Sequence, residues 1–212
     1  MKKISQIRLD YNLDSLKSQD LNTCPIKQFK FWFTNLLETS IADPTAMVLS
    51  TYNHDVGVTS RVVLLKDIED DGFVFYTNYN SMKGKQIASN KRVSLCFFWS
   101  HMQRQVRVQG IANMLSAESS ISYFSSRPRQ SQLAAACSSQ SNIIKSRADL
   151  EDRFSSLSKK YHKKSIPKPE NWGGYKIIPE QIEFWQGRSN RMHDRFRYTK
   201  EGSKWLIVRL DP

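Results

Sequence analysis

The sequence predicts a mainly β fold with peripheral helices, an α+β chain built around an antiparallel β-barrel. Five short segments between residues 45 and 115 are rich in β-branched and aromatic residues, and turn residues separate them. None of the connections between them has the length of a helical crossover. Closely spaced strands of this kind form an antiparallel meander that closes into a barrel.

A helix is expected before the strands, over residues 25–39. Pro25 suits the first helical turn, where no amide donor is needed. The apolar side chains that follow recur at helical spacing and form one face: Phe29, Trp32, Phe33, Leu36 and Leu37. We interpret this face as part of the core.

The five strands are expected at residues 45–52, 58–66, 72–78, 93–99 and 104–115. Polar and apolar residues alternate along the last of them, so Gln105, Arg107 and Gln109 should point away from the core. Two helices and two strands complete the prediction, at residues 116–126, 149–162, 175–185 and 205–210.

Length and charge restrict the function classes. The 212 residues fit a single domain, and 32 Lys and Arg against 20 Asp and Glu give a formal net charge of +12. This charge indicates anionic partners and leaves nucleic acid, a membrane surface and small phosphorylated ligands open. The longest apolar runs, such as residues 95–99, fall far below the roughly 18 residues of a membrane span. Three widely spaced cysteines indicate reduced thiols in a cytoplasmic protein, and no metal-ligand spacing occurs.

Polar clusters lie at the expected ends of elements, where ligands are usually held. Arg61 and Lys66 flank one strand, although charged strand ends are common. Another strand ends in residues 76–78, and Ser81 and Lys83 then begin a helix, where they either bind phosphate or simply cap the helix.

Two further clusters follow along the chain. Residues 123–131 combine hydroxyls with guanidiniums, which are phosphate ligands by type, although a turn rich in Ser and Pro would look the same. Gln140 and Ser141 are uninformative by themselves.

Residues 183–195 concentrate three arginines, His193 and Trp185 in a span too short and too polar for a core element. A solvated basic loop is one interpretation. A site for a planar anionic ligand is the other, because arginine pairs with phosphate and stacks on rings. No nucleophile elbow, glycine-rich nucleotide loop or pair of catalytic carboxylates accompanies these clusters. The chain is therefore expected to be a binding protein or an enzyme whose cofactor carries the reaction.

Taken in order, the motifs resemble those of the pyridoxine/pyridoxamine 5′-phosphate oxidase family over nearly the whole chain. They are Arg-x-Val-Leu-Leu-Lys, Phe-Tyr-Thr-Asn, Arg-Gln-Val, Ser-Arg-Pro-Arg-x-Ser-Gln, Trp-Gly-Gly, Glu-Phe-Trp-Gln-Gly and Arg-x-His-Asp-Arg. The resemblance implies an FMN-binding split β-barrel that works as a homodimer, with FMN at the subunit interface. It also implies oxidation of pyridoxamine 5′-phosphate and pyridoxine 5′-phosphate to pyridoxal 5′-phosphate by hydride transfer to FMN. Reoxidation of the flavin by O2 then gives H2O2.

The resemblance assigns site residues by motif position. Cofactor contacts fall to Arg61, Val62, Val63, Leu64, Leu65, Lys66, Tyr76, Thr77, Met82, Lys83, Gln105, Gln140, Ser141, Trp185 and Arg195. Substrate contacts fall to Arg8, Tyr11, Lys66, Tyr123, Arg127, Ser131, Arg191, Met192 and His193. Arg191 and His193 are the expected catalytic pair. Residues 1–22 are the expected cover over the site, and residues 23–212 the expected single domain.

One departure from the family concerns Met82, which stands where a second cation usually lies beside Lys83. It predicts weaker FMN retention unless Lys85 substitutes. Two alternatives stay open: another FMN split-barrel flavoprotein of the flavin reductase type, and a basic barrel that binds nucleic acid through stacked aromatics. The oxidase hypothesis expects neither nucleic acid nor a membrane as a partner.

Overall fold

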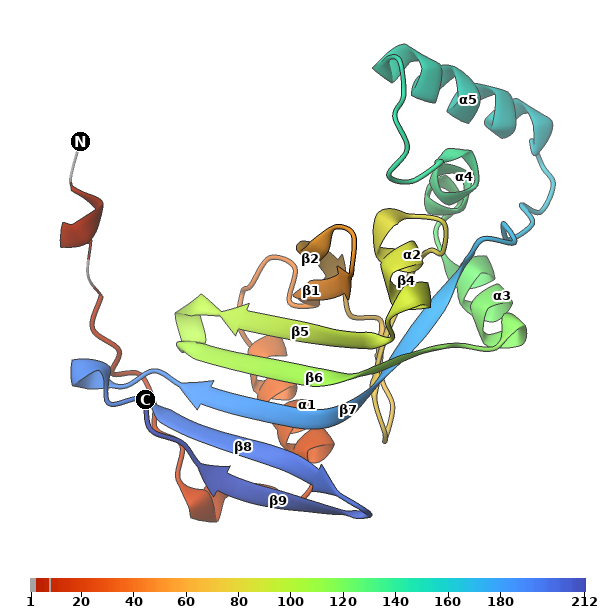
Figure 1. Ribbon diagram of the computed structural model, residues 1–212. Helices are drawn as coiled ribbons and strands as arrows, with labels where there is room; N and C mark the ends of the chain where they lie inside the picture. The colour runs from red at the N-terminus through yellow and green to blue at the C-terminus, as the bar shows by residue number, and fades with distance from the viewer. Residues whose placement is uncertain (1–2, 8) are drawn as a thin grey trace.

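The computed structural model describes residues 3–7 and 9–212 and centres on one nine-stranded antiparallel sheet (Figure 1). Its strands are β1 (Ala46–Asn53), β2 (Gly57–Leu64), β3 (Asp67–Ile68), β4 (Phe73–Asn78), β5 (Arg92–Trp99), β6 (Arg104–Met114), β7 (Trp172–Gln186), β8 (Asp194–Glu201) and β9 (Lys204–Arg209). They lie in the order β2-β1-β5-β6-β7-β4-β3, and β8 pairs with β7 and β9. The first half of β7 pairs with β4 and its second half with β8.

The barrel is split rather than closed. No ladder joins β2 to β3 or β4 in the described chain, although the Lys66 amide donates to Val74 O at 2.8 Å just beyond the end of β2. The mainly β fold class is confirmed, and the meander stays open along this edge.

The helices divide into two groups. Helix α1 (Pro25–Leu37) packs behind the sheet and α2 (Met82–Ser89) contacts β1, whereas α3 (Ala117–Ser126), α4 (Arg129–Cys137) and α5 (Arg147–Lys160) extend beyond the sheet at the upper right of Figure 1. Short 3-10 turns are η1 (Ile4–Gln6), η2 (Ser18–Asp20), η3 (Ser100–Met102) and η4 (Ser189–Arg191). No helix among the described residues is long and apolar enough to cross a membrane.

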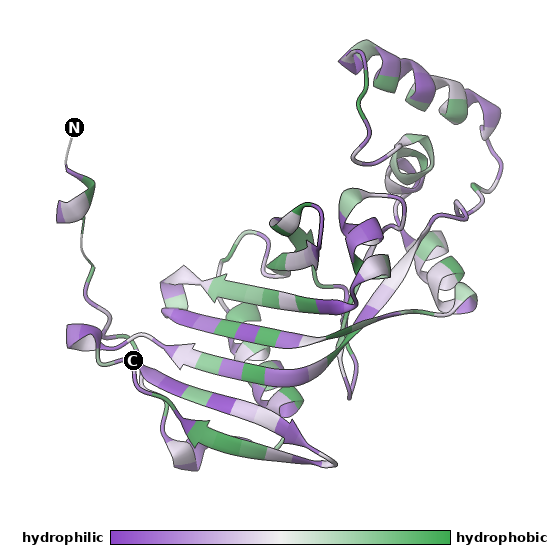
Figure 2. Ribbon diagram, viewed as in Figure 1, coloured by the Kyte–Doolittle hydropathy of each residue, from purple (hydrophilic) through white to green (hydrophobic). Residues whose placement is uncertain are grey.

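The core lies between α1 and the sheet. Phe29 is fully buried, with its ring centroid 4.8 Å from those of both Phe73 and Phe97. Figure 2 shows alternating hydrophilic and hydrophobic bands along β6, which match its alternating burial. Burial of one face of each strand fixes the register of the sheet, because a slip by one residue would expose the apolar set.

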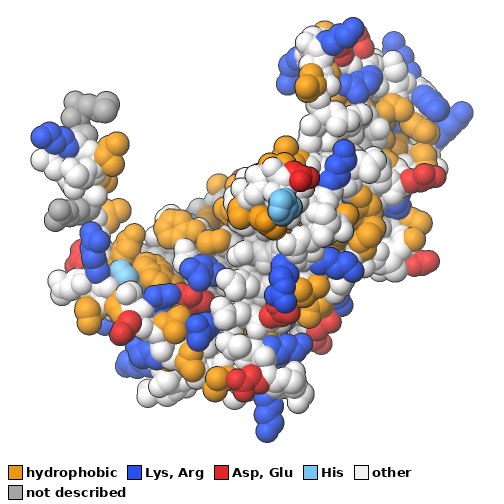
Figure 3. Space-filling model, in the orientation of Figure 1, with side chains coloured by type: hydrophobic (Ala, Val, Ile, Leu, Met, Phe, Trp, Pro, Cys, Tyr) orange, Lys and Arg blue, Asp and Glu red, His pale blue; other side chains and the backbone are white. Residues whose placement is uncertain are grey.

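The outer face of the sheet combines apolar and polar side chains. Val62 pairs in register with Val48, and Val48 pairs with Cys96, so the apolar side chains of β2, β1 and β5 share this face. Val62 and Phe98 are exposed. Figure 3 shows hydrophobic side chains over the β1–β2 hairpin and the neighbouring end of β5. One register row continues across the same face to the second half of β7 and to β8: Phe98, Gln105, Trp185 and Arg195.

Two longer elements, besides the two-residue strand β3, differ from the sequence prediction. The first is helix α4, which lies where the sequence indicated only a turn. It forms because Pro128 is followed by a run of helix-forming residues over 129–137. Strand β8 was not predicted, because charged residues flank its two buried aromatics, Phe196 and Tyr198. Residues 183–195 are therefore not a single loop: their ends belong to β7 and β8.

Candidate active site

The pocket

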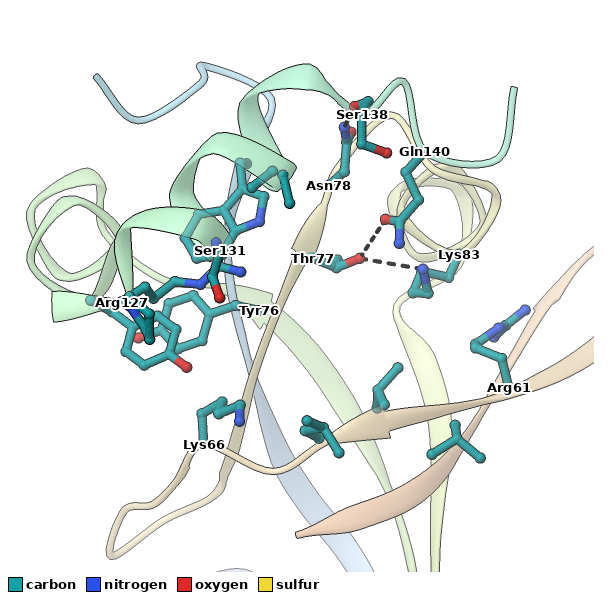
Figure 4. Close-up of a pocket in the computed structure, with 18 residues that line it drawn as sticks. Arg61, Lys66, Tyr76, Thr77, Asn78, Lys83, Arg127, Ser131, Ser138 and Gln140 are labelled. Atoms are coloured by element: carbon teal, nitrogen blue, oxygen red, sulfur yellow. Dashed lines mark hydrogen bonds between the residues drawn. The ribbon is translucent and has the colours of Figure 1, made fainter. Parts of the chain in front are cut away.

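A cavity of about 660 Å³ lies among β2, β4, α2 and the α3–α4 region (Figure 4). It brings together most residues predicted for the phosphate-bearing part of the site: Arg61, Val62, Val63, Leu64, Lys66, Tyr76, Thr77, Lys83, Tyr123, Arg127, Ser131 and Gln140. Four of these are cations, and no carboxylate lines the pocket in the described part of the chain. Such a lining selects an anionic ligand, because nothing else there balances the charge.

Arg61 is held against the pocket wall by the barrel itself. Its guanidinium donates to acceptors on β1, β2 and α2: Leu49 O at 3.1 Å, Thr51 Oγ1 at 2.7 Å, Gln86 Oε1 at 3.4 Å, and Thr59 Oγ1. All four acceptors are neutral. The guanidinium is thus oriented without being neutralised.

Lys83 is the second cation at this end of the pocket, and it is buried. Its Nζ lies 3.3 Å from Thr77 Oγ1, which in turn donates to Gln140 Oε1 at 3.2 Å (Figure 4). Burial, and then the charge of Arg61, lowers the pKa of Lys83. A bound anion would reverse that effect, because a nearby opposite charge favours the ammonium form.

The turn into α2 explains why Lys83 points inward. Ser81 caps the helix by accepting from the Gly84 amide at 3.3 Å. A Cβ on Gly84 would lie 2.1 Å from Tyr79 O, so only glycine allows the helix to start this close to the preceding turn.

The opposite end of the pocket is aromatic. Tyr76 stacks on Tyr123 at 3.8 Å and on Trp172 at 5.4 Å, and the Arg127 guanidinium lies 4.8 Å above the Trp172 ring. Arg127 Nη1 is buried and has no hydrogen-bond partner among the described residues. In Figure 4, Arg127 and Ser131 lie at one end of the pocket, and Arg61 and Lys83 at the other. The pocket therefore carries cations at two separate ends.

The second cluster

Most of the remaining site residues gather in a second cluster, away from the pocket. Trp185 and His193 lie 4.6 Å apart between ring centroids, and Tyr11 lies 5.8 Å from both. Met192 and Arg191 are exposed beside them, and the backbone of Arg191 has φ 63°. Such a left-handed conformation is uncommon outside glycine and is often found at functional turns.

His193 is held in one tautomer. The Arg188 amide donates to His193 Nδ1 at 3.1 Å, which leaves the ring proton on Nε2. Burial lowers the pKa of His193, and the charges of Arg191 and Arg195 lower it further. His193 therefore presents a neutral N–H donor.

Arg195 is paired within the same chain. Its Nε donates to Glu183 Oε1 at 2.9 Å, and the buried Glu183 also pairs with Arg107 at 3.1 Å. Gln105 lies opposite Trp185 in the β6–β7 ladder. Arg188, which sequence analysis did not assign to the site, pairs with Asp194 Oδ2 at 3.1 Å.

Strand β7 separates the two clusters. It spans 15 residues and carries Trp172 of the pocket at one end and Trp185 at the other. At a rise of about 3.3 Å per residue, these two tryptophans lie roughly 40 Å apart along the strand. One chain therefore does not bring the two predicted groups together.

A few predicted residues lie outside both groups. Leu65 is buried in the core, Met82 is exposed and does not line the pocket, and Ser141 follows Gln140 with φ 72°. Arg8 lies outside the described residues. The pocket also contains residues that sequence analysis did not assign, among them Asn78, Ser138 and Trp172. Trp172 could have been assigned to the site from the sequence, because it begins the Trp-Gly-Gly motif.

Comparison with known proteins

The structure thus combines an antiparallel split barrel with a pocket that has four cations and no carboxylate among its described lining residues. The chain belongs to the pyridoxamine 5′-phosphate oxidase family. The family model with that description matches residues 33–186. A second model, described as the pyridoxine 5′-phosphate oxidase C-terminal dimerisation region, matches residues 172–212.

Curated relatives cover the chain from end to end. A pyridoxine/pyridoxamine 5′-phosphate oxidase from Legionella pneumophila (strain Paris) is 48% identical over 211 residues, which is 100% of this chain and 98% of that protein. One of the same name from Gloeothece citriformis (strain PCC 7424) is 46% identical over 210 residues, covering 99% and 98% of the two chains.

Solved structures share the fold. PhzG from Burkholderia lata 383, in complex with tetrahydrophenazine-1-carboxylic acid, is similar with a TM-score of 0.89 and 27% identity over 95% of this chain and 100% of that chain. A pyridoxamine 5′-phosphate oxidase-related, FMN-binding protein from Nostoc punctiforme PCC 73102 has a TM-score of 0.71 at 15% identity, covering 91% and 100%. The second likeness bears on the fold alone.

Proposed function

We propose that this protein oxidises pyridoxamine 5′-phosphate and pyridoxine 5′-phosphate to pyridoxal 5′-phosphate, using FMN and O2. The observation that carries the proposal is the pocket, which holds cations at two ends and no carboxylate among its described lining residues. Two phosphorylated partners, a cofactor and a substrate, match two such ends. The full-length relatives named pyridoxine/pyridoxamine 5′-phosphate oxidase support the same activity.

The residues present fit FMN. A cavity of about 660 Å³ lies within the range of roughly 300 to 1,000 Å³ that small-molecule and cofactor sites occupy. Arg61 and the buried Lys83 would hold the cofactor phosphate, and the edge formed by Val62, Val63 and Leu64 would lie along its ring. When bound, FMN supplies the hydride acceptor and passes the electrons to O2, which yields H2O2.

The substrate phosphate belongs at the aromatic end. Lys66, Tyr123, Arg127 and Ser131 supply cations and hydroxyls there, and the unpartnered Arg127 Nη1 has a free donor for it. Gripping the phosphate fixes the substrate ring, and positioning of this kind lowers the barrier by removing translational and rotational freedom before the reaction.

Arg191 and His193 are proposed to act at the reacting end of the substrate. A permanent cation at Arg191 disfavours the protonated amine of pyridoxamine phosphate, because like charges oppose the charged form. His193 donates from Nε2 to a ring substituent, since its Nδ1 already accepts from the Arg188 amide.

We further propose a homodimer in which the second cluster of one copy faces the pocket of the other. The apolar outer face of β1, β2 and β5 suits a second copy, because contiguous exposed apolar surface marks protein interfaces. The same face carries Gln105, Trp185 and Arg195. The match of residues 172–212 to a dimerisation region supports this arrangement. A cytoplasmic location is proposed with it, since Cys24, Cys96 and Cys137 are free thiols.

The experiment is one purification followed by two assays. A yellow protein whose heat-released flavin is FMN, and which forms H2O2 with pyridoxamine 5′-phosphate, is expected. Unphosphorylated pyridoxamine serves as the matched substrate and should react poorly, because it leaves Arg127 without an anion. A colourless protein that FMN cannot reconstitute, or equal turnover of both amines, would refute the proposal.

A further inference from the structure

Residues 11–16 cross the end of the sheet beside the second cluster, and we name them the N-terminal strap. Three contacts tie the strap to the barrel. Asp14 Oδ2 accepts from Arg104 Nη2 at 2.6 Å, the Leu13 amide donates to Gln103 Oε1 at 3.2 Å, and the Leu16 amide donates to Asp194 Oδ2 at 3.1 Å. Segments near a chain terminus are poorly ordered unless tied down in this way.

Arg104 is the fixed half of the ion pair. Its side chain is 8% exposed, and its guanidinium lies 4.5 Å from the centre of the Trp32 ring. Its Nε donates to Gln186 Oε1 at 2.8 Å, and Gln186 Nε2 donates to the backbone carbonyls of the η3 turn at 3.2 Å. The Arg104 guanidinium is therefore held by the core as well as by the strap.

Asp14 is the more exposed half of the ion pair. Its side chain is 50% exposed, and it is the carboxylate that pairs with Arg104 among the described residues. Burial lowers the pKa of Arg104, and the bond to Asp14 opposes that shift. A buried guanidinium without this partner would be an uncompensated charge, so the pairing strongly favours the docked strap.

The strap ends at Tyr11, on the second cluster. The Tyr11 ring meets Trp185 edge-on, and the Ser189 hydroxyl donates to Tyr11 O at 3.3 Å. A Cβ on Gly187 would lie 2.9 Å from Tyr11 Cβ, so the missing side chain at Gly187 is what lets the ring lie against the backbone. The docked strap thus places the Tyr11 ring beside Trp185 and His193.

We propose that Arg104 is a positioning residue for the reacting end of the site: through Asp14 it holds the strap so that Tyr11 lies against Trp185 and His193. Arg104 itself is stacked in the core and acts through the strap. The expected effect of Arg104 on turnover rests on the proposed function, whereas its effect on the position of the strap does not.

The test uses Asp14, because its half-exposed side chain can be replaced without removing any group from the core. In the FMN-loaded enzyme, Asp14→Asn should raise the KM for pyridoxamine 5′-phosphate about tenfold, with kcat changed by less than about twofold. Asp14→Glu should restore most of the loss. Asp10→Asn makes the same charge change in the same segment, where Asp10 pairs with none of the described cations, and should behave as wild type.

A double-mutant cycle separates positioning from general stability. If Asp14 acts through Tyr11, then Asp14→Asn adds nothing to kcat/KM once Tyr11→Ala is present, and the two effects are non-additive. Hydrogen exchange of residues 11–16 provides the readout without activity, and it should speed up in Asp14→Asn but not in Asp10→Asn.

Additive effects in the cycle, or unchanged exchange in Asp14→Asn, would overturn the proposal. A wild-type protein without oxidase activity would refute the proposed function instead, and the exchange measurement would still decide whether the ion pair holds the strap.

Discussion

The Arg188 amide donates to His193 Nδ1 at 3.1 Å, so a backbone group five residues earlier in the chain selects the tautomer of the expected catalytic histidine. Burial and the charges of Arg191 and Arg195 hold the pKa of His193 below its usual 6.5. The folded state therefore resists protonation of this ring for two reasons. The neighbouring arginines repel a second positive charge, and a proton on Nδ1 would break the hydrogen bond that the Arg188 amide donates.

The first prediction concerns the pH dependence of His193. Because its pKa is lower in the folded than in the unfolded state, its contribution to stability is complete above about pH 6.5 and falls as the pH drops below that value. An NMR titration should place the pKa of His193 below 6.5, and Arg191→Met should raise it. The distant Arg92→Met should leave it unchanged, and a value above 6.5 in the wild type would contradict the assignment.

The second prediction concerns the missing cation at Met82. This exposed side chain stands at the first residue of α2, next to Lys83. Met82→Arg should tighten FMN about three- to tenfold, since a hydrogen bond to a charged group contributes about 1.5 to 3 kcal/mol when well formed and less where solvent screens it. Quenching of flavin fluorescence measures the affinity. Lys85→Met is the companion variant: a large loss of affinity there would show that Lys85 already fills the role.

The third prediction concerns Gln86, a neutral acceptor that helps to orient Arg61. Its Oε1 accepts from Thr51 at 2.6 Å and from Thr59 at 2.8 Å, with the Arg61 Nη2 at 3.4 Å. Gln86→Glu should weaken FMN about tenfold, because a carboxylate would pair with Arg61 and compete with the cofactor phosphate. Gln86→Met removes the acceptor without adding charge and should cost less affinity. Equal affinities for wild type and Gln86→Glu would show that Arg61 does not bind the phosphate.

The fourth prediction concerns the core. Phe29→Ala should lower the free energy of unfolding by about 3 to 5 kcal/mol, because it empties the space between α1 and the rings of Phe73 and Phe97. Phe31→Ala is the matched control on the same helix, where the ring is 53% exposed, and it should cost little. Chemical denaturation followed by tryptophan fluorescence measures both variants, and a similar loss in the two would mean that α1 packs by another face.

Much of the fold follows from local sequence patterns. The alternation of Val106 and Val108 with outward polar residues predicts β6, and the helical spacing of Phe29 and Trp32 predicts α1. Strand β8 escaped prediction because Phe196 and Tyr198 alternate with Arg195 and Arg197, and the pairing of Arg195 with Glu183 on β7 cannot be read from the local sequence.

Only part of the candidate site could be predicted from the sequence. Residues such as Lys83 and Arg127 lie in recognisable motifs, and they do line one pocket. The ion pair between Asp14 and Arg104 joins residues 90 positions apart, and no local pattern indicates it. The division of the predicted residues into two clusters was also hidden, because it depends on which half of β7 each partner strand joins.

The length of β7 determines how mutations in the two clusters should combine in a dimer. If each working site combines the pocket of one copy with the second cluster of the other, then a defect in either cluster damages both sites of a uniform dimer. A mixed dimer of a Lys83→Met chain and a His193→Asn chain would place both lesions in one site and leave the other intact. The two inactive variants, unfolded and refolded together, should therefore regain oxidase activity that neither shows alone, and failure of this complementation would mean that each site is built from a single chain.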